Sequence, residues 1–164
     1  AGQIAHGNAC RLDWEEVCPK EKDDEIYILG NPPYLGSKVQ SEAQKLDMEL
    51  AFQGWRNYKK LDFIGAWFKK GFDYIFRFNA KLAFVSTNSI IMGEQVPILW
   101  PYLFERGLEI FFGFKSFKWQ NNAKKNAGVT VVIIGVQNRN ASIQKRLYED
   151  DKVLNVSEIS PYLK

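Results

Sequence analysis

Hydrophobic residues recur along this chain in two alternating patterns, one typical of strands and the other of helices. Short apolar runs bounded by turn residues predict strands at 25–29, 81–87, 108–114 and 129–136. Apolar residues three and four positions apart predict helices at 41–54 and 61–78, and a shorter helix with prolines at 97–106. Strands that alternate with helices favour an α/β domain with a largely parallel sheet, in which ligands bind beyond the carboxyl ends of the strands.

Composition adds limits to this picture. The chain has 164 residues, of which 46% are hydrophobic and 25% charged, enough for about one domain with its own core. No apolar stretch approaches the ~18 residues of a membrane span, and residues 1–10 lack the pattern of a secretion signal, so we expect a cytoplasmic protein. One histidine and two cysteines are too few for a structural zinc site, so we expect free thiols and no metal.

Charge is unevenly distributed, although the formal net charge is only +3. Residues 13–25 are rich in carboxylates, whereas residues 110–148 contain basic side chains and no acidic ones. The basic residues are Lys115, Lys118, Lys124, Lys125, Arg139, Lys145 and Arg146. Such a segment attracts phosphates, but a solvated basic surface has the same composition, and charge alone does not separate the two.

The tetrapeptide Asn31-Pro32-Pro33-Tyr34 follows the first predicted strand, where α/β domains place their active sites. The two prolines restrict the backbone and hold Asn31 and Pro32 extended. The side-chain oxygen of Asn31 and the main-chain oxygen of Pro32 would accept the two N–H bonds of a planar amine and stabilise the charge it develops during methylation. Tyr34 offers an aromatic face for a base. The plainer interpretation is a Pro-Pro turn beside an asparagine.

This tetrapeptide resembles the catalytic motif of the S-adenosylmethionine-dependent adenine DNA methyltransferases. Residues 28–36, Ile-Leu-Gly-Asn-Pro-Pro-Tyr-Leu-Gly, are similar to the version found in large single-chain restriction-modification methylases. The resemblance implies a bacterial enzyme that transfers a methyl group to the N6 amine of an adenine flipped out of double-stranded DNA. It also implies a partial Rossmann-like class I methyltransferase domain, with a mostly parallel sheet and an antiparallel final hairpin.

Flanking segments extend the resemblance over nearly the whole chain. Gly7-Asn8-Ala9 is similar to the segment that contacts the adenine of the methyl donor, which implies donor contacts for Asn8 and Ala9. The resemblance of the tetrapeptide implies a donor contact for Asn31. Residues 85–90 resemble the segment that borders the target-base pocket, which assigns Asn88 to that pocket.

The segment 115–119 resembles the loop that supplies a second aromatic ring opposite Tyr34, so Phe117 and Trp119 are both candidates. The resemblance also implies contacts between DNA phosphates and a group of lysines, namely Lys38, Lys115, Lys118, Lys124 and Lys125.

Two parts of the family pattern are absent from residues 1–164, the glycine-rich donor loop and a target-recognition domain. We therefore expect these residues to be the C-terminal, catalytic-motif portion of one methyltransferase domain, without the N-terminal and C-terminal parts of its own polypeptide. On its own, this portion should bind S-adenosylmethionine weakly or not at all, and should be inactive.

Other functions are compatible with the same tetrapeptide. Enzymes that methylate a protein glutamine amide or a guanine amine in RNA also present a planar N–H pair to two acceptors. A non-catalytic nucleic-acid-binding module is a further alternative. The flanking segments and the basic segment favour DNA adenine, and the intact Asn31 and Tyr34 argue against a module without chemistry.

Overall fold

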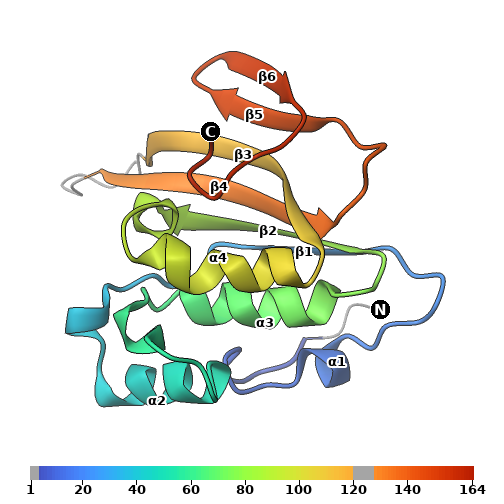
Figure 1. Cartoon of the computed structure of the whole chain (residues 1–164). Coiled ribbons are helices and arrows are strands. Elements are labelled where there is room, and N and C mark those ends of the chain that lie inside the picture. Colours follow the sequence, from blue (N-terminus) through green and yellow to red (C-terminus); the bar gives the residue numbers. More distant parts are fainter. Residues whose placement is uncertain (1–3, 120–127) are drawn as a thin grey trace.

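The computed structural model describes residues 4–119 and 128–164, which form a sheet covered by helices on one face (Figure 1). The strands are β1 (Ile26–Gly30), β2 (Ala80–Thr87), β3 (Leu108–Trp119), β4 (Val129–Asn138), β5 (Lys145–Glu149) and β6 (Lys152–Val156). The helices are α1 (Trp14–Val17), α2 (Glu42–Ala51), α3 (Gly65–Ile75) and α4 (Gln95–Glu105), with 3-10 turns η1 (Ser37–Val39), η2 (Tyr58–Lys60) and η3 (Asn88–Ile91). In these described ranges, no helix combines the length and apolarity needed to cross a membrane.

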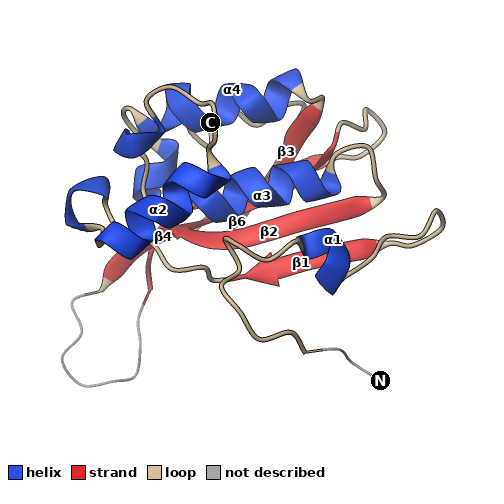
Figure 2. Cartoon of the chain, turned by 90° about the horizontal axis from the view of Figure 1, so that it is seen from below, coloured by secondary structure: helices blue, strands red, loops and turns tan. Residues whose placement is uncertain are grey.

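Helices α3 and α4 lie against the sheet, and α2 packs beyond α3, farther from the strands (Figures 1 and 2). The core between the layers is aromatic. Phe68 and Phe72 of α3 and Trp100 of α4 have ring centroids 5.7–6.0 Å apart, and Phe68 meets Phe84 of β2 edge-on at 5.3 Å. These rings are fully or almost fully buried, so this contact holds the helices on the sheet.

The sheet has the order β1-β2-β4-β3-β5-β6 and is mixed. The pairs β1–β2 and β3–β5 are parallel, whereas β2–β4, β3–β4 and β5–β6 are antiparallel. The α/β class and the antiparallel hairpin, β3–β4, are confirmed. Strands β1, β2, β3 and β5 share one direction, whereas β4 inserts between β2 and β3 in the opposite direction and β5–β6 adds a second antiparallel hairpin.

The helices begin and end where local hydrogen bonds allow. Ser41 caps α2 as predicted, in a reciprocal capping box with Gln44. Helix α3 is shorter than the predicted 61–78. At its end, the amide of Asn138 donates to the carbonyls of Ile75 and Phe78, both at 2.7 Å, and the left-handed Arg77 turns the chain toward β2.

In the last third of the chain, one prediction was wrong and one pair of strands was missed. Residues 115–119 belong to β3 rather than to a loop, because a bulge between Phe114 and Phe117 lets the strand pair with β4 up to Trp119. The hairpin β5–β6 was not predicted, since β6 is largely exposed and lacks an apolar alternation. Lys145 of β5 is buried because it forms an ion pair with the buried Glu109 at 3.1 Å.

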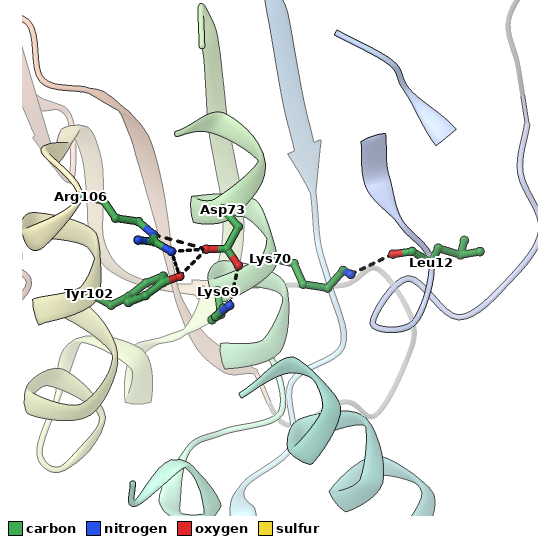
Figure 3. A network of polar contacts seen from close by, with 6 residues as sticks. All are labelled: Leu12, Lys69, Lys70, Asp73, Tyr102 and Arg106. Atoms are coloured by element: carbon green, nitrogen blue, oxygen red, sulfur yellow. Dashed lines mark hydrogen bonds and ion pairs between the residues drawn. The ribbon is translucent and has the colours of Figure 1, made fainter. Parts of the chain in front are cut away.

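A polar network connects α3 to its neighbours (Figure 3). The carboxylate of Asp73 accepts hydrogen bonds from Tyr102 at 2.5 Å and from Arg106 of the α4 end at 3.2 Å. Burial, with the hydrogen bond to Asp73, raises the pKa of Tyr102, so its hydroxyl stays protonated as a donor. On the other side of α3, Lys70 donates to the carbonyl of Leu12 at 2.8 Å, which fixes the N-terminal segment on the helix.

We predict that Gly135→Ala destabilises the sheet. The ring of Phe112 lies over Gly135, and an added Cβ would come 2.1 Å from its Cε1 atom, so the strands or the ring must shift. Overpacking of this kind costs about 1–3 kcal/mol in the free energy of unfolding, measured by urea denaturation. Gly36→Ala is the control, because a Cβ there meets no atom within 4 Å. Equal stability of the two variants would contradict this packing.

Candidate active site

The carboxyl ends of β1, β2 and β3 meet at one edge of the sheet, on the left in Figure 1. β1 and β2 are parallel, and β2 and β3 share a direction because both pair antiparallel with β4. Thr87 and Phe117 both lie opposite Val131, so the end of β2 and the end of β3 are level. The structure thus brings together the tetrapeptide after β1, Asn88 after β2, and the aromatic residues at the end of β3.

The tetrapeptide combines exposed and buried residues. Asn31 and Pro33 are exposed, Pro32 is buried, and Tyr34 is half-buried with part of its ring against the core. The alternation anchors the backbone through Pro32 and leaves the amide of Asn31 facing solvent. This edge therefore carries the exposed side chain of Asn31 and the half-buried ring of Tyr34, and the roles of these residues stay a prediction.

The residue after the tetrapeptide is fixed at both of its backbone groups. The N–H of Leu35 donates to Oδ1 of Asp62 at 2.8 Å. Its carbonyl accepts from the N–H of Phe63 at 2.9 Å and from Nε2 of Gln40 at 3.1 Å. The loop after β1 is thus hydrogen-bonded to the segment that begins α3.

Sequence reasoning missed Asp62, because the predicted helix at 61–78 included it. In the structure, Asp62 precedes α3 and accepts from the N–H of Ile64 at 3.3 Å. An aspartate at the start of an amphipathic stripe is a signal for a helix start, and it was available in the sequence.

A second cluster surrounds Asn8. Its Oδ1 accepts from the N–H of Cys10 at 2.9 Å, and its Nδ2 donates to Asp47 of α2 at 2.9 Å. Asp47 is buried and also accepts from Nε of Arg11 at 2.7 Å. The Asn8 amide is thus held in one orientation, with its oxygen toward Cys10 and its nitrogen toward Asp47. Sequence reasoning did not identify Asp47, since helix α2 gave no indication that one of its carboxylates faces the N-terminal segment.

Ala9 belongs to the Asn8 segment, and Asn88 follows β2 at the carboxyl edge of the sheet. Ala9 is half-buried, and its carbonyl accepts from Nε1 of Trp14 at 2.9 Å. Asn88 is half-buried and opens η3, directly after β2. Beside it, the hydroxyls of Thr87 and Ser89 are 2.7 Å apart.

The two candidate aromatic residues of β3 lie on the same face of the sheet. The ring centroids of Phe117 and Trp119 are 6.3 Å apart, with an interplanar angle of 43°. Phe117 is half-buried, whereas Trp119 is 42% exposed and lies farther out along the strand. Both remain candidates for the ring opposite Tyr34.

The predicted phosphate-binding lysines differ in their surroundings. Lys38 on η1 and Lys118 on β3 are exposed. Lys115 forms an ion pair with Glu149 of β5 at 2.9 Å, so a phosphate there would compete with a carboxylate. Lys124 and Lys125 lie outside the described residues. The assignment of these five lysines to DNA phosphates stays a prediction.

We predict that the two cysteines react with iodoacetamide at very different rates in the folded protein. Cys18 is exposed, whereas Cys10 is buried beside Asn8. Burial, and then the charge of Asp47, raises the pKa of the Cys10 thiol to about 12, so the thiolate fraction at pH 8 is on the order of 10⁻⁴. Mass spectrometry should show alkylation of Cys18 alone until denaturant is added. Rapid native alkylation of Cys10 would contradict the geometry around Asn8.

Comparisons with known proteins show the family of this chain. The family model described as MmeI, DNA-methyltransferase domain, matches residues 1–149. The chain is 52% identical over 163 residues to DNA methyltransferase A of Bacillus subtilis (strain 168), covering 99% of this chain and 18% of that protein.

Solved structures extend the comparison. The type IIL restriction-modification enzyme MmeI, solved in complex with DNA, matches 98% of this chain and 22% of its own, at 38% identity and a TM-score of 0.89. The type IIG restriction endonuclease BpuSI matches 89% of this chain and 17% of its own at 11% identity and a TM-score of 0.57, which shows the fold alone. The chain therefore spans about a fifth of each relative, and it belongs to the MmeI DNA-methyltransferase domain family.

Proposed function

We propose that this chain supplies the catalytic edge of an enzyme that transfers a methyl group from S-adenosylmethionine to the N6 amine of an adenine in double-stranded DNA, within a restriction-modification system. The observation that carries the proposal is the exposed Asn31 next to the buried Pro32, at the carboxyl end of β1. Membership of a DNA-methyltransferase family supports the reaction class. The preference for adenine rests on the chemistry of the tetrapeptide.

The amine of adenine is a weak nucleophile because its lone pair is conjugated with the ring. In the proposed reaction, Oδ1 of Asn31 and the main-chain oxygen of Pro32 each accept one N–H bond, which aims the lone pair at the incoming methyl group. The N–C bond forms as the methyl–sulfur bond breaks, and the positive charge moves from sulfur to nitrogen. The two oxygens stabilise that charge until a proton leaves, so no prior deprotonation is needed.

S-adenosylmethionine supplies an electrophilic methyl group when it is bound. The residues present fit part of such a donor, because the exposed amide of Asn8 is oriented by its bonds to Cys10 and Asp47, and the half-buried Ala9 follows it. Such an amide can hydrogen-bond the polar edge of a purine, and we propose that Asn31 lies beside the methyl group of the bound donor. Since residues 1–164 contain no glycine-rich loop, we propose that this chain alone binds the donor weakly and is inactive.

The target adenine is proposed to stack on Tyr34 after it leaves the duplex. In the sheet order β1-β2-β4-β3, the loop after β1 and the end of β3 lie on either side of two strand ends, and we propose that the base stacks on Tyr34 with Phe117 or Trp119 as the second ring. Asn88 directly follows β2, the first of these two strands. Lys38 and Lys118 are exposed at the same edge and would contact phosphates.

We predict that Asn31→Ala lowers kcat by about 10²–10³-fold, because loss of one preorganised hydrogen-bonding group costs about 3–4 kcal/mol in the transition state. The protein from the complete reading frame is assayed with radiolabelled S-adenosylmethionine on duplex DNA, RNA and a glutamine-containing peptide, and the methylated product is identified by mass spectrometry. Asn155→Ala is the control, since Asn155 is exposed on β6, far from this edge.

N6-methyladenine in DNA would support the proposal. Methylation of only the peptide or only the RNA would replace it with the corresponding alternative. Unchanged turnover of Asn31→Ala would leave a nucleic-acid-binding module without this chemistry as the better account.

We predict a different pattern for Tyr34. Tyr34→Phe keeps the stacking surface and should retain kcat/KM within about threefold, whereas Tyr34→Ala should lose about 1–3 kcal/mol, or 5- to 150-fold. Replacement of the target adenine by 2-aminopurine gives a second measurement, because its fluorescence rises when the base leaves the stack. Equal losses in the two Tyr34 variants would contradict a stacking role.

A further inference from the structure

Asp62 is an unusual residue for this site, because it is a buried carboxylate without a basic partner among residues 4–119 and 128–164. It is 6% exposed, and none of the ion pairs in the described ranges involves it. Burying a charge without a counter-charge is expensive unless hydrogen bonds satisfy it. The hydrogen-bond donors around Asp62 therefore indicate its structural role.

Those donors come from three separate elements. Oδ1 accepts from the N–H of Leu35, directly after Tyr34, and from the N–H of Ile64 at the start of α3. Oδ2 accepts from the hydroxyl of Ser89 at 3.3 Å, directly after Asn88. One carboxylate thus connects the loop after β1 to the segment after β2.

Asp62 is itself held in place. Its N–H donates to Oε1 of Gln95 at 2.9 Å, and Nε2 of Gln95 donates to the carbonyl of Lys60 at 2.9 Å. Gln95 begins α4, which packs on the sheet. The position of the Asp62 carboxylate is therefore fixed by a core helix rather than by a surface loop. Asp62 is therefore fixed through its backbone N–H, while its side chain holds Leu35 and Ser89.

We propose that Asp62 is a positioning residue, which sets the distance between Tyr34 after β1 and Asn88 after β2, beside the proposed target base, and thereby aims the carbonyl of Pro32. This inference rests on the proposed function. Asp62 touches neither donor nor base in this account, and it acts only through Leu35 and Ser89. A misplacement of about 1 Å costs about 10²-fold in rate. Hydrogen bonds that position Leu35 and Ser89 can therefore affect turnover, although they do not touch the substrate.

The test compares three variants of the protein from the complete reading frame, with radiolabelled S-adenosylmethionine and genomic DNA that lacks N6-methyladenine. Asp62→Ala removes all three bonds and should lower kcat by about 10- to 100-fold, with the KM for S-adenosylmethionine changed by less than about twofold. Asp62→Asn should keep kcat within about threefold, because its Oδ1 still accepts from Leu35 while the Ser89 hydroxyl accepts from its Nδ2.

Glu109→Ala is the matched control. Glu109 is another buried carboxylate, 5% exposed, that accepts from a backbone N–H, that of Asn140 at 3.0 Å, but it lies at the amino end of β3, away from this edge. It should lose at least as much stability as Asp62→Ala and keep the kcat of the folded protein. Circular dichroism fixes the folded fraction in each case. If Asp62→Ala does not fold, Ser89→Ala removes only the connection to β2 and should lower kcat by about 3- to 10-fold.

Two results would overturn the inference while the proposed function stands, namely a folded Asp62→Ala with normal kcat, or an equal loss of kcat in Glu109→Ala. For Ser89→Ala, normal kcat has the same meaning. Failure of the proposed function is distinct, because it shows as methylation that survives Asn31→Ala.

Discussion

The site depends on one constraint, the fixed backbone at the end of β1. Pro32 is buried and Leu35 is bonded at both its N–H and its carbonyl, so the residues between them have little freedom. Acceptors that stabilise a developing charge are effective when they need no rearrangement during the reaction. A flexible loop with the same four residues would have the right atoms without a defined direction.

The rest of the fold supports this constraint from one side. The aromatic contacts of α3 and α4 with β2 keep the start of α3 beside the carboxyl ends of the strands, and the Asp62 carboxylate transmits that position to the loop. On the opposite side, the Asn8 segment is bonded to α2 through Asp47 and to α3 through Lys70 (Figure 3). The loop after β1 and the Asn8 segment are thus both hydrogen-bonded to α3 or to the residues just before it.

Sequence patterns predicted the elements that form this scaffold, because strands and helices with buried faces carry regular apolar spacing. The tetrapeptide was identified for a related reason, since its chemistry lies in four adjacent residues. Asp62, Asp47 and Gln95 were not identified, because their roles depend on partners 27 to 39 residues away in the chain. Spacing along one segment does not contain that information. The edge strand β6 was missed because it is largely exposed and carries no apolar alternation.

The central claim is that two oxygens at the end of β1 hold the amine of the target adenine. The most direct measurement is a structure of the protein from the complete reading frame with a DNA duplex containing its methylation site and S-adenosylhomocysteine. We predict an extrahelical adenine whose N6 atom lies within about 2.7–3.2 Å of both Oδ1 of Asn31 and the main-chain oxygen of Pro32. An adenine that remains stacked in the duplex, or an N6 atom beyond hydrogen-bond distance of both oxygens, would contradict the account.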